Sequence, residues 1–600
     1  MAEQQQRPSI MGGHARRGNR GMPVEKPKEL GKTVARLWKY VGRHQFKLIL
    51  VVIFVISSTL INLRGTSVIG AAIDNYILPG DFVGLRLELL RLAGIYLLSA
   101  ILSWSQLQLA VNLAQHTVAD IRRDLFEKLQ VLPLRFFDTT PRGDIMSRIT
   151  NDVDTVSNAL NAGISQLISS LMTIVGILFF MLSLSPRLTL VTVVTVPILL
   201  AATRFITKHS RVYFKQQQKV LGELNGIIEE NITGQKVIKV FVKEDDVIKQ
   251  LNASNDELRD IGVKAQVFSG IMGPVSTFIN NLSYGFVAIA GAVMKIHLGV
   301  ITSFLLYSRQ FARPFSEISQ LFNTLLSAVA GAERIFNVMD LDPEPEDAPE
   351  AVEITDVKGR VDFENVDFSY VAGTPILKNI NLYAKPGQTI ALVGPTGAGK
   401  TTIINLLTRF YDIQKGTISI DGKNIFDIKR SSLRKMLGIV LQDTYLFSGT
   451  IYENIAYGRP DATEAQVREA AILANAHEFI RRLPQGYDTV LSEDSDTISQ
   501  GQKQMLAIAR TILADPSILI LDEATSNVDT RTEVKIQQAM LTLMKGRTSF
   551  VIAHRLSTIR NADLIAVLRD GEIIERGSHK ELMQQKGFYY GLYMNQFSEG

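Results

Sequence analysis

Apolar residues form long uncharged runs in the first half of the chain and short runs between polar segments in the second half. The uncharged runs cover residues 48–63, 92–119, 157–186, 188–203 and 266–294. Each is of the length that a membrane-spanning helix requires. The first half is therefore predicted to be a helical membrane domain.

A sixth apolar stretch, residues 296–330, carries Arg309, Arg313 and Glu317 at helical spacing. Charge inside a membrane is costly and usually faces a water-filled cavity or a partner. Two interpretations remain open at this stage. The three side chains either reach the cytosolic interface from the end of the helix or provide a polar lining for a substrate cavity.

Two charged stretches separate these runs, at residues 120–154 and 208–264, and both are rich in Lys and Arg. The positive-inside rule places both stretches and the N-terminal tail in the cytosol. Six spans with both ends inside satisfy this constraint.

The helices are expected to extend well below the bilayer, because about 20 helical residues reach roughly 30 Å. The turns near Pro133–Asp138, with Phe136 and Phe137 as apolar anchors, and near Asn231–Lys243 are expected to contact a cytosolic domain.

Composition narrows the function classes only slightly. The net charge of +5 over 600 residues gives little reason to expect a nucleic-acid partner. The absence of cysteine excludes disulfides, thiolate metal sites and thiol nucleophiles. The first 45 residues are polar and lack the apolar core of a signal peptide, so they are interpreted mainly as a disordered cytosolic tail.

A phosphate-binding loop follows a short predicted strand, Thr389–Val393, and precedes an apolar helix. The loop reads Gly394, Pro395, Thr396, Gly397, Ala398, Gly399, Lys400, Thr401, Thr402. Glycines let backbone N–H groups approach the phosphates, and the helix dipole adds attraction. Lys400 is expected to reach the β- and γ-phosphates, and the Thr401 hydroxyl to bind Mg²⁺.

A second buried strand, Ile518–Leu521, ends in Asp522 and Glu523. This arrangement is typical of a P-loop ATPase in which one carboxylate holds magnesium and the other lies beside the attacking water. Asp522 is the predicted metal ligand, and Glu523 is the predicted general base.

The segment Ile498, Ser499, Gln500, Gly501, Gln502 resembles the signature sequence of ABC transporters. The resemblance implies that Ser499, Gly501 and Gln502 bind the nucleotide held by another subunit, and hence that the protein acts as a dimer. Taken alone, the segment would be an ordinary polar helix start.

Other elements of the same family follow in the right order. Tyr370 resembles the aromatic residue that stacks on adenine. Gln442 resembles the glutamine that senses magnesium, takes part in catalysis and contacts the cytosolic turns of the membrane domain. Asp529, at the end of segment Ser526–Asp529, resembles part of the loop between subunits. His554 resembles the switch histidine at the γ-phosphate.

The membrane half resembles type IV (six-helix) ABC exporters, and the most similar class is the catalytically complete subunit of bacterial heterodimeric multidrug exporters. The segments that carry this resemblance are 143–154, 332–334, 307–314 and 526–530, together with the N-terminal tail. Three departures from the family stand out. Ile498 replaces leucine, and residues 296–304 are several residues short of the family spacing. Residues 492–497 lack the glycine that relatives commonly carry, in the segment where the resemblance implies a contact between subunits through Glu493.

The resulting expectation is a multi-domain chain in which an all-α six-helix transmembrane domain is fused to an α/β P-loop ABC ATPase domain. The predicted boundaries are a tail at 1–36, a membrane domain at 37–335, a linker at 336–358 and an ATPase domain at 359–600. The linker is acidic and rich in proline.

The resemblance implies ATP-driven multidrug-type export with ATP and Mg²⁺, by a multi-pass protein of the bacterial inner membrane with a cytosolic ATPase domain. The expected partners are a second half-transporter, preferably a different chain, membrane lipids and a small hydrophobic substrate. A lipid flippase and an ATP-gated channel remain as alternatives. Aromatic and Met residues of the spans either line a cavity or pack against lipid and other helices: Trp104, Phe179, Phe180, Met181 and Phe278.

Overall fold

The structure is a computed structural model that describes residues 28–311, 313–441, 444–491, 498–523, 529–553 and 556–597. The chain divides into two compact units. The first holds the residues up to Leu132 and Thr139–Pro343, and the second holds Pro133–Asp138 with Glu344–Gly600.

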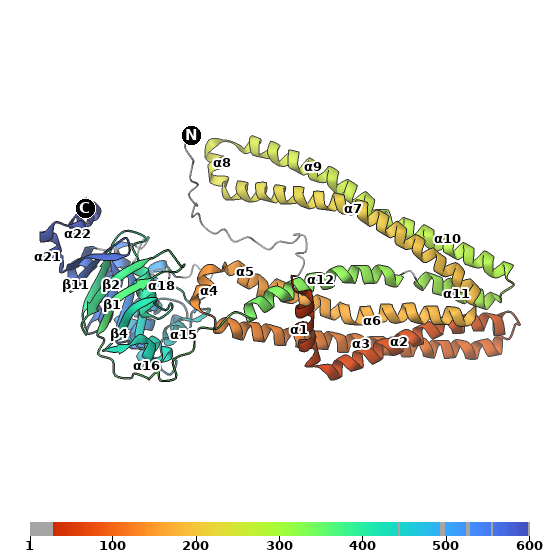
Figure 1. Cartoon of the computed structure of the whole chain (residues 1–600), viewed down its shortest axis with the longest axis horizontal. Coiled ribbons are helices and arrows are strands. Elements are labelled where there is room, and N and C mark those ends of the chain that lie inside the picture. The colour runs from red at the N-terminus through yellow and green to blue at the C-terminus, as the bar shows by residue number, and fades with distance from the viewer. Residues whose placement is uncertain are drawn as a thin grey trace. The chain divides into compact units, whose positions relative to one another are not determined.

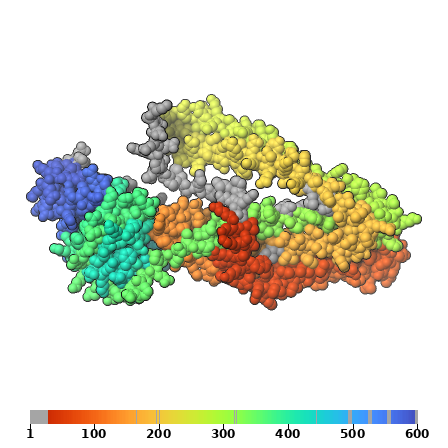
Figure 2. All heavy atoms as spheres, in the orientation of Figure 1, coloured from red at the N-terminus to blue at the C-terminus, as the bar shows by residue number. Residues whose placement is uncertain are grey.

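The first unit is helical throughout its described part. Its helices are α1 (Leu30–Gly42), α2 (Gln45–Ala72), the π-helix η1 (Ile73–Ile77), α3 (Phe82–Gln130), α5 (Arg142–Ser147), the π-helix η2 (Arg148–Asp152), α6 (Val153–Leu184), α7 (Pro186–Thr233), α8 (Gln235–Phe241), α9 (Glu244–Gly270), α10 (Met272–Val293), α11 (Leu298–Phe311) and α12 (Arg313–Met339). Helix α2 packs against α3, α6 and α11, and α12 packs along α6. Helices α7 and α9 form a long hairpin with α8 at its tip, which projects as a yellow arm in Figures 1 and 2.

Two helices of the described chain are long and apolar enough to cross a membrane by length and composition, Gln45–Ile77 and Arg142–Leu184. They contain the first predicted span and nearly all of the third. The second and fourth predicted spans fall within α3 and α7, the fifth covers the end of α9 and α10, and the sixth covers the pair α11 and α12. The arrangement of six spans therefore stays a prediction.

The short stretch before the sixth predicted span is tightly packed. The Gly299 N–H donates to Asp74 Oδ1 of η1 over 2.6 Å, so a carboxylate from another helix satisfies a backbone donor at the start of α11. A Cβ on Gly299 would lie 2.0 Å from the Gly70 carbonyl oxygen. Two glycines thus allow α2 and α11 to approach closely.

The observed elements cross two of the predicted boundaries. Helix α1 begins at Leu30, inside the predicted tail, because it packs on α12. Tyr40 stacks on Phe336, and Arg36 pairs with Asp340 at 2.6 Å. Helix α12 itself runs to Met339, which lies past the predicted end of the membrane domain.

The charged residues of the sixth predicted span make specific contacts. Glu317 accepts hydrogen bonds from Gln166 (2.6 Å) and Ser170 (3.1 Å) of α6. Its other oxygen accepts from Arg313 at 2.7 Å. These contacts tie α6 to α12, so Glu317 serves the packing of the two helices, while Arg309 is exposed.

The candidate cavity residues differ widely in burial. Met181 is fully buried in a cluster formed by α2, α6, α7, α10 and α11, and Phe180 stacks on Tyr307. The exposed members of the set are Trp104, Phe179 and Phe278. Met181 is therefore a packing residue.

The second unit contains two main sheets. The four-stranded antiparallel sheet has the order β2 (Leu377–Ala384), β1 (Val361–Phe368), β4 (Lys415–Ile420), β5 (Lys423–Asn424). The six-stranded sheet has the order β12 (Glu572–Gly577), β11 (Leu564–Arg569), β3 (Thr389–Val393), β10 (Thr548–Ala553), β9 (Ile518–Glu523), β6 (Leu437–Val440). A small pair joins β7 (Gly449–Thr450) to β8 (Val490–Leu491).

The described helices of the unit are α4 (Leu134–Thr139, with Thr139 at the boundary), α13 (Lys400–Leu407), α14 (Arg430–Lys435), α15 (Ile451–Ala456), α16 (Glu464–Leu473), α17 (His477–Ile480), α18 (Gln500–Ala514), α19 (Thr530–Met544), α20 (Leu556–Asn561), α21 (His579–Gln585) and α22 (Phe588–Phe597), with the 3-10 turns η3 (Ile425–Asp427) and η4 (Gly486–Asp488).

The central strands of the six-stranded sheet are parallel and continuously apolar. Residues Ile518–Leu521 of β9 are fully buried, with side chains packing into cores on both faces of the sheet. Parallel sheets have this pattern because helices or other layers cover both faces. The strands Thr389–Val393 and Thr548–Ala553 match their predicted bounds. The α/β class of this unit is thereby confirmed.

Candidate functional site

Two of the predicted nucleotide-binding segments lie at one edge of the six-stranded sheet. Strands β3, β10, β9 and β6 are mutually parallel neighbours, so their carboxyl ends meet at this edge. The phosphate-binding loop follows β3, and Asp522 and Glu523 end β9. Ligands of open α/β sheets bind at such an edge.

The phosphate-binding loop depends on glycine for both its conformation and its packing. Gly397 and Gly399 have φ values of +85° and +102°, in the region that other residues rarely adopt. A Cβ on Gly399 would also lie 2.5 Å from Leu377 Cδ2. Gly399 is the N-cap of α13, and among the described residues no side chain caps this helix. This geometry suits an anion.

Lys400 extends from the first turn of α13 over the same loop. Its ammonium donates to the carbonyl oxygens of Gly394 (2.7 Å) and Pro395 (3.0 Å), and the residue is only 8% exposed. Burial lowers the pKa of Lys400, and the charge of Asp522 opposes this shift. A cation is therefore held between the loop and the end of β9.

The predicted metal ligands include an exposed hydroxyl and a carboxylate. Thr401 is exposed at the start of α13, and Asp522 lies at the end of β9, within electrostatic reach of Lys400. Hydroxyl and carboxylate oxygens are the donors that Mg²⁺ prefers, so these residues fit the ion. Gln442, His554 and the side chain of Glu523 lie outside the described residues, although β6 and β10 end at the same edge.

Tyr370 is held between β1 and the phosphate-binding helix. Its hydroxyl donates to Thr402 Oγ1 (3.3 Å) and accepts from Asn405 Nδ2 (3.1 Å), both on α13. Its ring packs edge-on against Phe368, with centroids 4.8 Å apart. The half-buried ring is thus fixed beside the helix that carries the loop.

The signature segment forms the start of α18. Gln502 N–H donates to Ser499 Oγ (3.3 Å), and Ser499 N–H donates to Gln502 Oε1 (2.8 Å), which together make a capping box. Ser499 is exposed and Gly501 is buried. Within one chain these side chains therefore act as an N-cap.

The predicted loop between subunits ends at a second helix cap. Asp529 accepts from the Thr532 N–H over 3.0 Å at the start of α19. Hydrogen bonding to Thr532 lowers the pKa of Asp529. Residues 524–528 and 492–497, including Glu493, lie outside the described residues.

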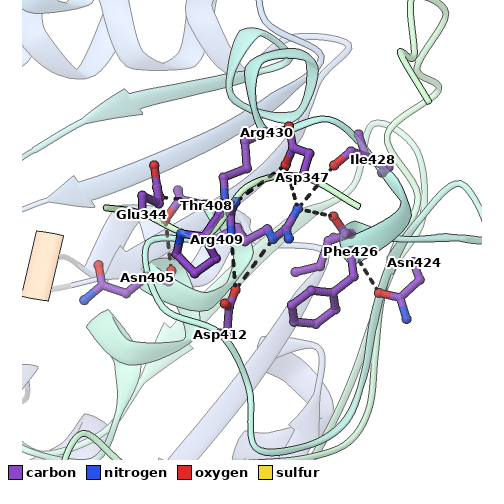
Figure 3. A network of polar contacts seen from close by, with 12 residues as sticks. Glu344, Asp347, Asn405, Thr408, Arg409, Asp412, Asn424, Phe426, Ile428 and Arg430 are labelled. Carbon is purple, nitrogen blue, oxygen red and sulfur yellow. Dashed lines mark hydrogen bonds and ion pairs between the residues drawn. The ribbon is translucent and has the colours of Figure 1, made fainter. Parts of the chain in front are cut away.

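Sequence reasoning missed a group of arginines near the phosphate-binding helix. Arg409, just after α13, lies among Asp347, Asp412 and Arg430 (Figure 3). Arg434 pairs with Glu344. Nothing in the spacing of these residues indicates the network, because two of its acidic members, Glu344 and Asp347, come from the segment predicted to be a linker.

Comparison with known proteins agrees with this geometry. A family described as the ABC transporter transmembrane region matches residues 48–315, and one described as ABC transporter matches residues 377–526. An uncharacterized ABC transporter ATP-binding protein, YfiC of Bacillus subtilis, is 48% identical over 96% of both chains.

Two further relatives carry functional names. The fatty acid ABC transporter ATP-binding/permease protein of Mycobacterium bovis is 46% identical over 86% of this chain and 83% of its own. The ATP-dependent lipid A-core flippase of Syntrophus aciditrophicus is 37% identical over 88% of both chains.

A helical membrane region and a P-loop ATPase in one polypeptide define a membrane transporter powered by ATP. The chain belongs to the ABC transporter family, as an exporter half-transporter whose ATP hydrolysis is coupled to transport. ABC exporters of this kind act as dimers in a lipid membrane.

Proposed function

We propose that the protein exports hydrophobic or amphipathic molecules across the bacterial inner membrane as one half of a dimer, by alternating access. The observation that carries the proposal is the start of α13, which no described side chain caps and where the Lys400 ammonium lies over the phosphate-binding loop. A triphosphate supplies the negative charge that this arrangement attracts.

In the proposed site, the loop from Gly394 to Thr402 binds the phosphates and Tyr370 stacks on adenine. Thr401, Asp522 and Gln442 would hold Mg²⁺, which neutralises phosphate charge when bound. Glu523 orients or deprotonates the attacking water, and His554 contacts the γ-phosphate. Ser499, Gly501 and Gln502 bind the partner's nucleotide, while Asp529 belongs to the loop between subunits.

An exposed apolar tip on the α7–α9 arm supports the dimer. Val240, Phe241 and Val242, at the end of α8, are 76%, 69% and 81% exposed. Soluble surfaces rarely expose such clusters unless they bind a partner. We assign this tip to contact with the ATPase domain of the second subunit.

A heterodimer is favoured over a homodimer by the resemblance of the chain to complete subunits of heterodimeric multidrug exporters. Both termini and the ATPase domain are assigned to the cytosol, because the loops at 120–154 and 208–264 are rich in Lys and Arg. A lipid flippase is the second candidate, since one relative is named a lipid A-core flippase and another a fatty acid transporter.

The test is Mg²⁺-dependent ATPase activity of the protein in lipid, alone and with candidate partner subunits, for wild type and Glu523→Gln. We expect turnover to fall about a hundredfold or more while ATP binding persists, because only the catalytic carboxylate changes. Near-normal turnover in an assembled variant dimer would contradict the role of Glu523.

Transport assays in the same vesicles separate the candidate functions. Uphill flux of a soluble amphiphile supports export, and movement of labelled lipid between leaflets supports the flippase. Downhill ion current gated by ATP would instead show a channel. Activity that appears only with a second chain establishes the heterodimer.

A further inference from the structure

The segment directly after the phosphate-binding helix is held rigidly. Arg409 has a positive φ of 51° and is 5% exposed. Its guanidinium donates to the carbonyl oxygens of Ile425 (3.2 Å) and Ile428 (3.3 Å), and it pairs with Asp347 at 3.4 Å (Figure 3). A buried cation with several acceptors fixes the backbone around it.

Tyr411, two residues later, therefore projects from a fixed backbone. Its ring meets that of Tyr370 edge-on, with centroids 4.9 Å apart and planes at 87°. It also approaches Phe368 at 5.9 Å, so three aromatic rings form one cluster beside the predicted adenine position.

The hydroxyl of Tyr411 donates to the carboxylate of Asp138. Asp138 lies between two predicted membrane spans in the sequence, yet Pro133–Asp138 belongs to the compact unit that contains Glu344–Gly600. Burial, together with the hydrogen bond to Asp138, raises the pKa of Tyr411. The phenol therefore stays a proton donor throughout the neutral pH range.

These contacts leave Tyr370 with two kinds of support. Thr402 and Asn405 of α13 form hydrogen bonds with its hydroxyl, and the rings of Phe368 and Tyr411 pack edge-on against its ring. The first support comes from the phosphate-binding helix. The second leads, through the Tyr411 hydroxyl, to the cytosolic turn at Asp138.

We infer that Tyr411 is a positioning residue that makes adenine stacking on Tyr370 depend on the docking of the turn Pro133–Asp138. The inference rests on the proposed role of Tyr370 in ATP binding. It specifies that the turn acts on the base of the nucleotide, while the phosphate contacts of Lys400 stay independent of the turn. A movement of this turn would thus change affinity for ATP more than affinity for its triphosphate group.

The experiment compares the binding of ATP and of inorganic triphosphate to the full chain in lipid nanodiscs, with its partner subunit where one is required. Tyr411→Phe keeps the ring and removes the hydroxyl, and Asp138→Ala removes the acceptor. We expect each variant to weaken ATP binding about three- to tenfold, in line with the net strength of one hydrogen bond, and to leave triphosphate binding unchanged. The double variant should be no weaker than either single variant, because both remove the same link.

Matched controls are Tyr383→Phe on β2, where the residue is 45% exposed, and Asp144→Asn on α5, which is also exposed. Neither control should change the ratio of the two affinities. Tyr411→Ala removes the ring as well and should change the ratio further than Tyr411→Phe. An equal loss of ATP and triphosphate binding would indicate general damage to the domain and would overturn the inference.

Tyr370→Ala separates this inference from the proposed function. If Tyr370→Ala leaves the ATP-to-triphosphate ratio intact, the adenine assignment itself is wrong. If Tyr370→Ala lowers the ratio while the Tyr411 and Asp138 variants leave it unchanged or act additively, the assignment stands and the link through Tyr411 is wrong.

Discussion

Helices α13 and α18 both begin at predicted phosphate-binding segments, yet their first turns differ. Helix α13 starts at Gly399 without a side-chain cap, whereas α18 starts at Ser499 with a complete capping box. A helix start leaves several N–H groups unsatisfied. The start of α13 is open to an anion within one chain, and the start of α18 already has an internal acceptor. The difference fits the proposed function, in which one chain supplies the phosphate-binding half of a site and the signature segment binds a nucleotide held by a second subunit.

The strongest test of this comparison uses two capping boxes with the same chemistry. Ser499 caps α18, and Thr463 caps α16, where Gln466 N–H donates to Thr463 Oγ1 at 3.4 Å. Changing either residue to Ala should cost about 1 kcal/mol of local helix stability. Only Ser499→Ala should also lower, by about tenfold or more, the ATP retained at the shared site, because it removes a hydrogen bond to a charged group.

Radiolabelled ATP retained by the assembled dimer measures this effect, with Glu523→Gln present in both variants to stop turnover. Equal retention in the two variants would mean that Ser499 is only a helix cap.

A smaller difference between paired variants is expected at the start of α13, in the hydrogen exchange of β2. Gly397→Ala and Gly399→Ala both force alanine to a positive φ, but only the second places Cβ against Leu377, at 2.5 Å. The backbone strain is of the order of 1–3 kcal/mol at either position. The additional clash should make hydrogen exchange of β2, which begins at Leu377, faster in Gly399→Ala than in Gly397→Ala. Identical exchange in β2 would show that the loop relaxes without disturbing the strand.

The smallest expected effect concerns the cap of α19. Because hydrogen bonding lowers the pKa of Asp529 in the folded protein, its stabilising contribution is present above the ordinary Asp pKa, about 4. That contribution is lost as pH falls through the lowered value. Asp529→Asn should therefore flatten the acid dependence of hydrogen-exchange protection in α19, since Asn caps a helix without titrating. An unchanged acid profile would place the pH dependence on other groups.

The buried strands that lead to the sheet edge were the most predictable part of the ATPase unit. The bounds of β3 and β10 matched, because buried parallel strands are short continuous apolar runs between polar loops. The start of α1 at Leu30 was missed, because its packing on α12 joins residues about 300 positions apart. The prediction of a linker at 336–358 also missed the ion pairs of Glu344 and Asp347, because their arginine partners lie far along the chain.

The sequence by itself determined the classes of both halves, the family, and the order of the candidate nucleotide residues, because hydropathy and loop chemistry are local properties. Only the tertiary structure showed that Ser499 is occupied as a cap, that Glu317 joins α6 to α12, and that Tyr411 connects Tyr370 to Asp138. Such contacts depend on which distant segments meet, and hydrogen bonds and ring packing between them leave no periodic trace along the chain.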